Sequence, residues 1–169
     1  MRGIVDVEMD SVILREYAAA DFRDFVDAQS LAFSRLALGA YSREQLAAVE
    51  AARKTDERAR EMLEIRELVA IAPDGRVIGG AGFTPQPGES GCARIRRVFV
   101  HPDFAGRGLG RRLISEVERR ASELAFERFV VFASLNAVPF YEKLGYRVVR
   151  PEERSYGAIA VRFVFMSKG

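Results

Sequence analysis

Residues 100–114, VHPDFAGRGLGRRLI, place three glycines at alternating positions between an apolar run and an amphipathic one. Glycine is entropically costly in a folded chain, so this repeat indicates a backbone that a ligand must approach closely. A glycine-rich turn between a strand and a helix is a general anion site, because the first turn of a helix has unpaired N–H groups and a positive dipole end. The stretch therefore predicts a phosphate-binding turn.

Two common phosphate-binding motifs do not fit this turn. A Walker loop requires Lys-Ser or Lys-Thr after its last glycine, but Gly110 is followed by two arginines. A dinucleotide-binding fingerprint requires a third glycine three residues beyond the second, and the two positions that this spacing reaches are Arg111 and Leu113. Both motifs are therefore rejected.

The composition is that of an ordinary globular protein. The chain has 169 residues, of which 49% are hydrophobic and 30% charged, and its formal net charge is +2. This length predicts a single domain over residues 1–169, and so small a charge gives no indication of a nucleic-acid partner. Cys92 is the one cysteine and His101 the one histidine, so we expect neither a disulfide nor a metal site.

The N-terminal sequence and the hydropathy of the chain indicate the cellular compartment. Residues 1–10, MRGIVDVEMD, carry acids where a signal peptide carries bases, and we interpret them as an N-terminal extension. No apolar stretch approaches the length of about 18 residues that a membrane span needs. We expect a cytoplasmic protein without a membrane partner, in which Cys92 is a reduced, small packing residue.

Periodicity predicts helices mainly in the first third of the chain and around the glycine turn. Residues 22–33 repeat apolar side chains near a period of 3.6, and Ser42 with Gln45 forms a capping box that opens the next helix. Residues 56–65 are helical, either continuous with the preceding helix or broken near residues 54–55. An amphipathic helix runs from the glycine turn to Leu124, and Asn136 is expected to cap a short helix that ends at Gly145.

The expected strands are short runs of alternating or wholly apolar residues bounded by turn residues. They are residues 12–14, 68–72, 76–83, 93–100, 128–133, 146–149 and 158–166. The second and third form a hairpin around the turn at residues 73–75, and the apolar run 128–133 indicates burial on both faces.

Two segments carry a resemblance to a known family. Residues 96–118, RRVFVHPDFAGRGLGRRLISEVE, resemble the acyl-coenzyme A binding motif of the GCN5-related N-acetyltransferase (GNAT) superfamily: Arg or Gln, two residues, Gly, any residue, then Gly or Ala. Gly108 and Gly110 occupy its two small positions, whereas Ala105 stands where the family has Arg or Gln. Residues 133–149 are similar to a second family signature, in which Asn136 is followed by Tyr141 and a Gly-aromatic step.

The resemblance implies a fold and an activity. The fold is α+β, with a mixed, mostly antiparallel central sheet of about six or seven strands that splays between two central strands and carries helices on both faces. The activity is transfer of an acetyl group from acetyl-CoA to a primary amine of a small molecule or protein, by direct attack on the thioester. The alternative is a non-catalytic acyl-CoA binding or regulatory module.

The resemblance also implies the site residues. Tyr141 is the residue next to the coenzyme sulfur and the expected catalytic group. The pantetheine arm lies along the backbone of one central strand, and the pyrophosphate lies on the amides of residues 105–110. The implied coenzyme-binding residues are Val98, Phe99, Val100, Ala105, Gly106, Arg107, Gly108, Leu109, Gly110, Arg111 and Asn136.

The proton acceptor is not identified by the sequence. Many family members have a glutamate on the strand before the glycine turn, but its position here is occupied by Arg94. Glu89, Glu67 and water held by backbone carbonyls remain alternatives. His101 precedes Pro102 on the phosphate side, which disfavours it as the base.

The acceptor end and the oligomeric state are predicted more coarsely. In the family the acceptor pocket is built from early helices, which points to residues 33–45, including Tyr41. The arginines at 94, 96 and 97 either favour an acidic acceptor or form the solvated side of a strand, and we favour the solvated side. The apolar run 158–166 makes a homodimer an expectation.

Overall fold

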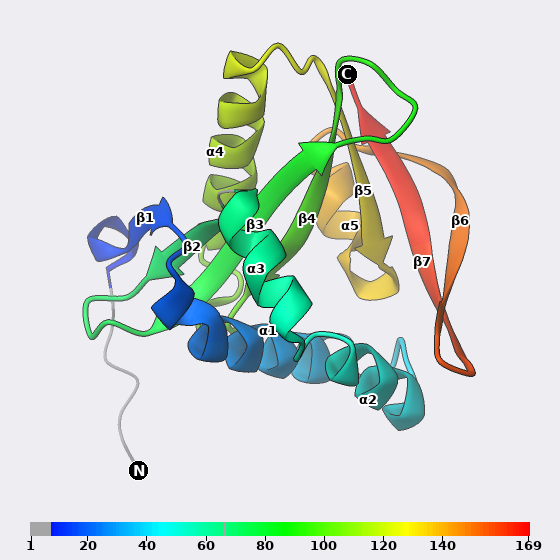
Figure 1. Ribbon diagram of the computed structural model, residues 1–169, viewed down its shortest axis with the longest axis horizontal. Coiled ribbons are helices and arrows are strands. Elements are labelled where there is room, and N and C mark those ends of the chain that lie inside the picture. The colour runs from blue at the N-terminus through cyan, green and yellow to red at the C-terminus, as the bar shows by residue number, and fades with distance from the viewer. Residues whose placement is uncertain (1–7, 66) are drawn as a thin grey trace.

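The structure, a computed structural model, describes residues 8–65 and 67–169. The described residues form one open seven-stranded sheet in the order β1-β2-β3-β4-β5-β7-β6 (Figure 1). Its strands are β1 (Ile13–Glu16), β2 (Leu68–Ile71), β3 (Val77–Pro85), β4 (Cys92–Val100), β5 (Arg128–Ser134), β6 (Arg147–Tyr156) and β7 (Ile159–Lys168).

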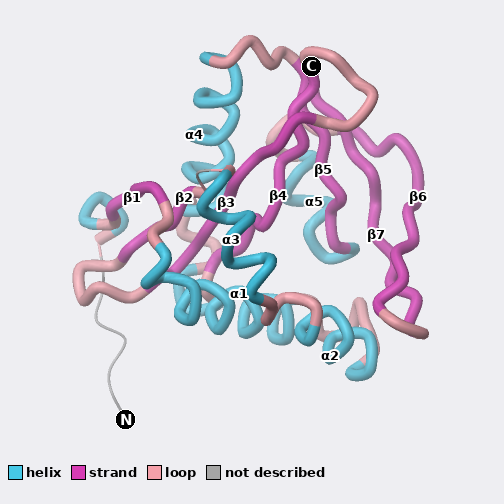
Figure 2. The backbone as a smooth tube through the Cα atoms, in the orientation of Figure 1, coloured by secondary structure: helices cyan, strands magenta, loops and turns pink. Residues whose placement is uncertain are grey.

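Helices cover both faces of this sheet (Figure 2). They are α1 (Phe22–Leu36), α2 (Arg43–Ala51), α3 (Asp56–Glu64), α4 (Leu109–Glu123) and α5 (Val138–Glu142). Helix α4 packs with α5 on one face, which we call the α4 face, and α1 packs on the other, the α1 face, together with Met62 of α3. The expected α+β class is therefore confirmed.

The sheet splays between its two central strands. All neighbouring strands of the described sheet pair antiparallel except β4 and β5, which pair parallel. Their register runs from Cys92 opposite Arg128 to Ile95 opposite Val131, where it ends although β4 continues for five residues. The predicted separation of two central strands is therefore confirmed, and it leaves the second half of β4 without a partner on the β5 side.

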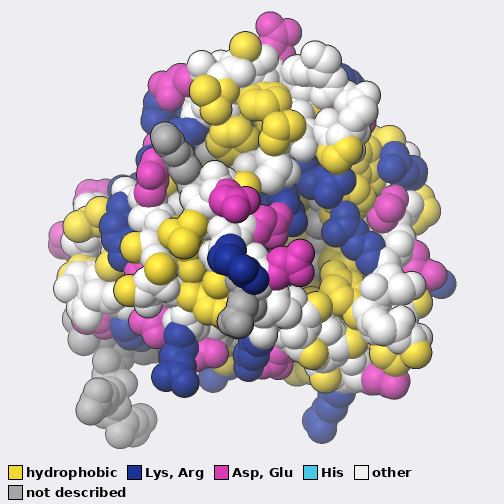
Figure 3. Space-filling model, in the orientation of Figure 1, with side chains coloured by type: hydrophobic (Ala, Val, Ile, Leu, Met, Phe, Trp, Pro, Cys, Tyr) yellow, Lys and Arg dark blue, Asp and Glu magenta, His cyan; other side chains and the backbone are white. Residues whose placement is uncertain are grey.

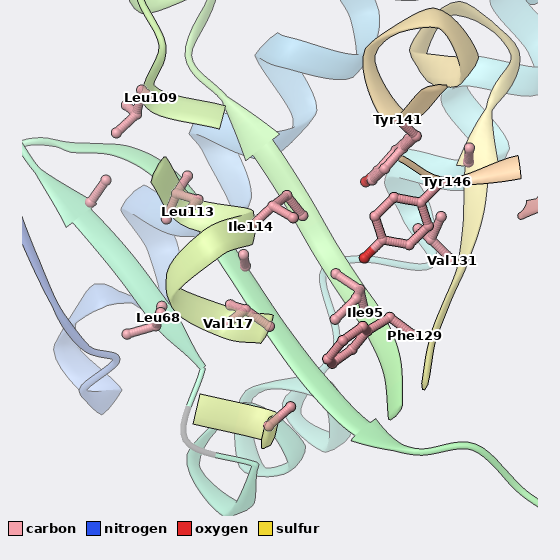
Figure 4. Close-up of a cluster of buried hydrophobic side chains, with 14 of the residues drawn as sticks. Leu68, Ile95, Leu109, Leu113, Ile114, Val117, Phe129, Val131, Tyr141 and Tyr146 are labelled. Atoms are coloured by element: carbon pink, nitrogen blue, oxygen red, sulfur yellow. The ribbon is translucent and has the colours of Figure 1, made fainter. Parts of the chain in front are cut away.

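The α4 face contains the larger core. Helix α4 buries Leu113, Ile114, Val117 and Ala121 against residues such as Ile95, as its amphipathic period predicts (Figure 4). Full burial of each large aliphatic side chain contributes about 1.5–3 kcal/mol. This packing fixes the start of α4, and with it the glycine turn, against the strands.

The α1 face holds β4 through an aromatic contact. The rings of Phe25 and Phe99 lie 4.8 Å apart, edge to face. Gly80 on β3 leaves the space for both, because a Cβ atom there would lie 2.4 Å from Cε2 of Phe25. The second half of β4 thus packs against α1 on one face of the sheet, while its edge toward β5 has no strand partner.

The helix boundaries follow local capping. Ser42 and Gln45 form the predicted capping box, in which the Ser42 Oγ accepts from the Gln45 N–H at 3.1 Å and the Gln45 Oε1 accepts from the Ser42 N–H at 3.0 Å. The helix is interrupted between α2 and α3, and Thr55 caps α3: its Oγ1 accepts from the Arg58 N–H at 3.2 Å. Of the two alternatives for residues 54–55, the break is the correct one.

Two expectations about the C-terminal third are wrong. Asn136 does not cap α5: it lies inside a 3₁₀ turn (Leu135–Ala137), and Ala137 occupies the N-cap position without a side-chain hydrogen bond. Strand β6 extends to Tyr156 rather than ending near residue 149, because backbone pairing with β7 overrides its charged sequence.

The N-terminal extension predicted for residues 1–10 lies, except for its last three residues, outside the described part of the chain. A 3₁₀ turn (Met9–Ser11) precedes β1, and the Met9 carbonyl accepts from Arg112 Nη1 at 3.1 Å. No helix of the described residues combines the length and the apolar character required to cross a membrane.

Candidate active site

A cleft of about 1340 Å³ opens where β4 and β5 separate. Phe99 of β4 and Val131 of β5 both line it, as the family resemblance requires. On the α4 face it is bordered by the glycine turn and by α5. On the α1 face it continues between α1, α3 and β6, and we call this part the arginine end. The cleft thus passes through the gap in the sheet.

The glycine turn has the backbone conformation that its sequence predicts. Gly106 and Gly108 have φ angles of +75° and +85°, and a Cβ atom at either position would meet nothing within 4 Å. These two glycines are therefore required by backbone geometry. Gly110 serves close packing instead, because its Cβ would lie 3.1 Å from Cζ of Phe140.

The turn presents backbone donors to the cleft. The first helical hydrogen bond of α4 runs from the Arg112 N–H to the Gly108 carbonyl at 3.1 Å. Several amides before it donate to no acceptor among the described residues, namely those of Gly106, Gly108, Leu109, Gly110 and Arg111. They lie at the positive end of a 15-residue helix, which favours an anion by about 0.3–1 kcal/mol beyond the hydrogen bonds. This cradle of amides matches the requirements of a pyrophosphate.

The side chains predicted around the turn divide into two groups. Ala105 and Arg111 line the cleft, and Arg111 is exposed. Leu109 points away from the cleft into the core, where it is 2% exposed. The Arg107 guanidinium lies over the Phe104 ring and borders a separate small hollow beside Met9. Of these side chains, Arg111 is therefore the charged one that lines the cleft, whereas those of Arg107 and Leu109 do not.

The open half of β4 contains the three residues predicted to hold the pantetheine arm. Val98, Phe99 and Val100 all line the cleft. Phe99 and Val100 still pair with β3, but an irregularity in the register separates them from the pairing of Arg96. Within this bulge Arg97 has a φ angle of +55°, a left-handed conformation that is strained for a residue with a side chain.

Contacts between guanidinium and carboxyl groups hold the bulge, and the one between Arg97 and Glu67 is buried. Arg97 Nη1 lies 3.1 Å from Glu67 Oε2, and Arg97 Nη2 contacts Glu61 Oε2. The other carboxylate oxygen of Glu61 contacts Arg96. The Arg97 side chain is only 7% exposed and Glu67 is fully buried. The prediction of a solvated strand face is therefore wrong at Arg97. A left-handed residue in a bulge turns its side chain to the other face, which period-two reasoning could not anticipate.

Tyr141 of α5 lines the cleft. Its ring is 4% exposed and packs 5.4 Å from the Tyr146 ring and 5.1 Å from the Phe140 ring. Figure 4 shows its hydroxyl directed toward β4. That hydroxyl makes no hydrogen bond with a described residue, whereas the Tyr146 hydroxyl donates to Glu118 at 2.8 Å. Burial raises the pKa of Tyr141, so the phenol stays protonated.

The expected base candidates are not placed to accept a proton in the cleft. Glu89 lies 3.3 Å from Arg128 and does not line the cleft, and His101 does not line it either. Burial raises the pKa of Glu67 to about 7 despite Arg97, but Glu67 lies behind that arginine. Glu61 lines the cleft, yet Arg97 and Arg96 outweigh its burial and hold its pKa below the usual range.

The acceptor segment was predicted only in part. Phe33 lines the arginine end, but Tyr41 does not reach the cleft. The Tyr41 hydroxyl donates to the Arg162 carbonyl at 2.6 Å and accepts from the Leu135 N–H at 2.9 Å, so it joins the α1–α2 connection to β7 and to the 3₁₀ turn after β5. Gln45 likewise donates to a carbonyl of β7.

Sequence reasoning missed the residues that form most of the arginine end. They come from α1, the α2–α3 connection, α3 and β6, and include Gln29, Arg53, Arg58, Arg154 and Tyr156. No motif joins these positions, and only the surplus of arginine over lysine in the sequence hinted at such a cluster. Asn136, by contrast, lines the cleft, and its role in coenzyme binding stays a prediction. Among the described residues there is no group of three His, Cys, Asp or Glu that could hold a metal ion.

Comparison with known proteins agrees with this geometry. Residues 37–168 match the family model described as the acetyltransferase (GNAT) domain. The chain is 32% identical to a glucosamine 6-phosphate N-acetyltransferase of Trypanosoma brucei brucei over 106 residues, which are 60% of this chain and 71% of that protein.

Solved structures share the fold over nearly the whole chain. A GCN5-related N-acetyltransferase from Rhodopseudomonas palustris superposes with a TM-score of 0.81 and 25% identity, covering 98% of this chain and 99% of the other. The PaiA N-acetyltransferase from Thermoplasma acidophilum, solved in complex with coenzyme A, has a TM-score of 0.76 at 18% identity and covers 94% and 98%.

Proposed function

This chain belongs to the GNAT acetyltransferase family and is an acetyl-CoA-dependent N-acetyltransferase, and from that premise we propose which of its groups bind the coenzyme and carry out the transfer. The acceptor is a primary amine of a small molecule or protein. The observation that supports this assignment most strongly is that one cleft joins the free amides of the glycine turn, the unpaired half of β4 and the Tyr141 hydroxyl.

The coenzyme lies across the gap between β4 and β5. Its pyrophosphate accepts hydrogen bonds from the amides of Gly106 and of residues 108–111, with the Arg111 side chain beside it. Its pantetheine arm pairs with the free backbone groups of Val98–Val100, as an added strand pairs with the edge of a sheet. Asn136 borders the same part of the cleft from the β5 side.

The reaction is attack of the amine on the thioester carbonyl. The C–N bond forms, the carbonyl oxygen becomes an oxyanion that a backbone N–H of the open β4 edge stabilises, and the C–S bond then breaks. The sulfur leaves as a thiolate, and the ammonium proton leaves with solvent in the cleft. With Glu89, Glu67 and His101 away from the cleft surface, water held at backbone carbonyls is the proton acceptor we propose.

Tyr141 donates a hydrogen bond to the departing sulfur. A phenol with a pKa near 10 is a weaker acid than a thiol near 8.5, so full proton transfer would be uphill by about 2 kcal/mol even before burial. Burial raises the pKa of Tyr141 further and so keeps the hydroxyl a donor. Its role is therefore to stabilise the developing thiolate.

The test is thiol release from acetyl-CoA across a panel of amines, comparing the wild type with Tyr141→Phe. We expect turnover of at least one amine, a kcat lowered about 10- to 1000-fold in Tyr141→Phe, and acetyl-CoA affinity within about twofold of the wild type. Tyr146→Phe is the matched control. It removes the hydroxyl of the neighbouring ring, which donates to Glu118 rather than facing the cleft unbound, and we expect it to leave kcat unchanged.

The alternative function makes a different prediction in the same assay. A non-catalytic acyl-CoA binding module binds acetyl-CoA and turns over no amine. An unchanged kcat in Tyr141→Phe, with the chemical step shown to be rate-limiting, would exclude the role given to Tyr141 while leaving the acetyltransferase intact.

Further properties accompany this proposal. We place the enzyme in the cytoplasm, as one domain over residues 1–169, without a metal or a nucleic-acid partner. A homodimer that extends the sheet would use one of its edge strands, β1 or β6, because β7 is already paired along both edges by β5 and β6.

A further inference from the structure

The arginine end of the cleft contains several guanidinium groups that form no ion pair with a carboxylate of the described residues. Four of its guanidinium groups make no ion pair with any residue that the structure describes: those of Arg53, Arg58, Arg94 and Arg154. Figure 3 shows Lys and Arg side chains gathered beside the hollow that opens next to α3. Unpaired cations at a partly buried surface are costly, so their presence requires an explanation.

The first pair lies between α1 and α3. Arg58 Nη2 donates to the Gln29 Oε1, and its Nε is buried without a hydrogen-bond partner. Arg53 Nη1 donates weakly to the Gln29 carbonyl at 3.4 Å, and its guanidinium lies 4.6 Å above the Phe33 ring. Two cations thus share one neutral residue. Burial lowers the pKa of each to about 10, and at Arg58 the charges of Arg97 and Arg53 add to that effect.

The second pair lies on the ring of Phe132, a cleft residue of β5. The Arg154 guanidinium is 4.0 Å and the Arg94 guanidinium 4.7 Å from the centre of that ring. Arg94 also donates to the amide oxygen of Gln86 at 2.9 Å. Burial lowers the pKa of Arg94, and the charges of Arg154 and Arg96 lower it further. Stacking on an aromatic ring orients a guanidinium and leaves its in-plane donors available.

The acids of the same end do not balance these four charges. Glu61 is already bound by Arg96 and Arg97, each through a different oxygen. Glu57 and Glu64 are exposed on α3. The arginines at 53, 58, 94 and 154 are therefore held in place by two side-chain amides, a backbone carbonyl and two aromatic rings, with donors left over.

We propose that the arginine end binds an anionic group of the acceptor, a carboxylate or a phosphate, so that the amine substrate of this enzyme carries a negative charge. The inference rests on the proposed acetyl transfer, because it names the substrate class of the same cleft. A planar guanidinium presents paired N–H donors that fit both carboxylate and phosphate oxygens. Binding the anion at this end would hold the amine toward the gap between β4 and β5.

The test compares amines that differ only in the anion. Phenylalanine with phenethylamine, and tyrosine with tyramine, probe a carboxylate; O-phosphoethanolamine with ethanolamine probes a phosphate. We expect the charged member of at least one pair to have a kcat/KM more than tenfold above its neutral partner. Neutral amines that are equal or better in every pair would overturn the proposal.

Arginine variants assign the effect to this site. Arg154→Gln is expected to lower kcat/KM for the charged amine at least tenfold and to leave its neutral partner unchanged. Arg150→Gln is the matched control: it lies on the same strand and also stacks on a ring, 4.2 Å from the centre of Phe165, but does not line the cleft. Arg58→Gln provides a second variant from α3. Equal losses for charged and neutral amines in both cleft variants would contradict the proposal.

A binding experiment separates failure of this inference from failure of the proposed function. If acetyl-CoA binds but no amine is turned over, the acetyltransferase assignment fails, and calorimetry with inorganic phosphate on coenzyme A-saturated protein then decides the inference. Phosphate binding that Arg154→Gln or Arg58→Gln weakens at least fivefold, and Arg150→Gln does not, supports the anion site. No binding, or binding that none of the variants changes, overturns it.

Discussion

Glu67 is a fully buried carboxyl group with one strong partner. Its Oε2 accepts from Arg97 at 3.1 Å, and its Oε1 has no hydrogen bond. Gly82 on β3 leaves room for it, because a Cβ there would lie 2.7 Å from Oε2. Burial outweighs Arg97 and raises the pKa from 4.5 to about 7. The residue that anchors the β4 bulge is therefore also a group that titrates in the neutral range.

This raised pKa makes stability depend on pH. The folded protein retains a proton on Glu67 that the unfolded chain releases above pH 4.5, so the contribution to stability is complete below that pH and is lost as the pH rises through about 7. We predict that the free energy of unfolding of the wild type, relative to Glu67→Gln, falls by up to about 3 kcal/mol between pH 5 and 8. Urea denaturation of both proteins across this range measures it.

Subtracting the pH profile of Glu67→Gln from that of the wild type cancels the contributions of the other titrating groups. Burial lowers the pKa of His101, whose contribution therefore rises with pH and has the opposite sign, but it is common to both proteins. Glu61→Gln is the control, since the lowered pKa of Glu61 places its effect below pH 5. Parallel pH profiles for the wild type and Glu67→Gln would show that Glu67 is ionised throughout and held by Arg97.

At the scale of single residues, the sequence identified groups whose role depends on local backbone or motif position. Gly106, Gly108 and Tyr141 lie where the turn and the family signature predict. Arg97 and Glu67 could not be placed in the same way. Their pairing depends on a bulge in β4 and on the register of β3, and neither is encoded in the few residues around them.

At the scale of elements, the turn before α4 is the feature that most directly links sequence to binding. Gly108 and Gly75 have the same φ of +85°, and each has open space where a Cβ would stand. Gly75 lies in the β2–β3 hairpin turn, away from the cleft. The two positions therefore allow backbone strain to be separated from ligand binding.

We predict that Gly108→Ala and Gly75→Ala each reduce the free energy of unfolding by about 1–2 kcal/mol, because both force alanine into the left-handed region. Only Gly108→Ala should weaken acetyl-CoA binding, about tenfold or more, since it moves the amides that receive the pyrophosphate. Chemical denaturation and calorimetry with acetyl-CoA measure the two effects. Equal coenzyme affinities in the two variants would contradict the cradle.

Elements with strong periodicity or caps were predicted well, and those fixed by pairing were not. Helices α1 and α4 and the β2–β3 hairpin match expectation because their signals are local. The part of β6 after residue 149 is charged and contains Pro151, so nothing in its own sequence indicates a strand, and its pairing with β7 makes it one. Asn136 has a common capping residue type, but the 3₁₀ turn before α5 moves the cap to Ala137.

At the scale of the whole molecule, the open sheet creates a cleft with two chemically different ends. The end on the α4 face was predictable, because one continuous segment, residues 92–111, carries the strand, the turn and the helix start. The arginine end was not, because Arg53, Arg58 and Arg154 come from segments separated by about a hundred residues and meet only in the folded chain. The GNAT resemblance is confirmed by the family match and by the fold.

The central claim is that the backbone amides before α4 hold the pyrophosphate of acetyl-CoA. The most direct measurement is a residue-resolved ¹H–¹⁵N NMR titration of the protein with acetyl-CoA. We expect downfield shifts and slowed solvent exchange for the amides of Gly106, Gly108, Leu109, Gly110 and Arg111, with the exposed residues of β6 unchanged. Saturation with acetyl-CoA that leaves those five amides where they were, while others move, would contradict it.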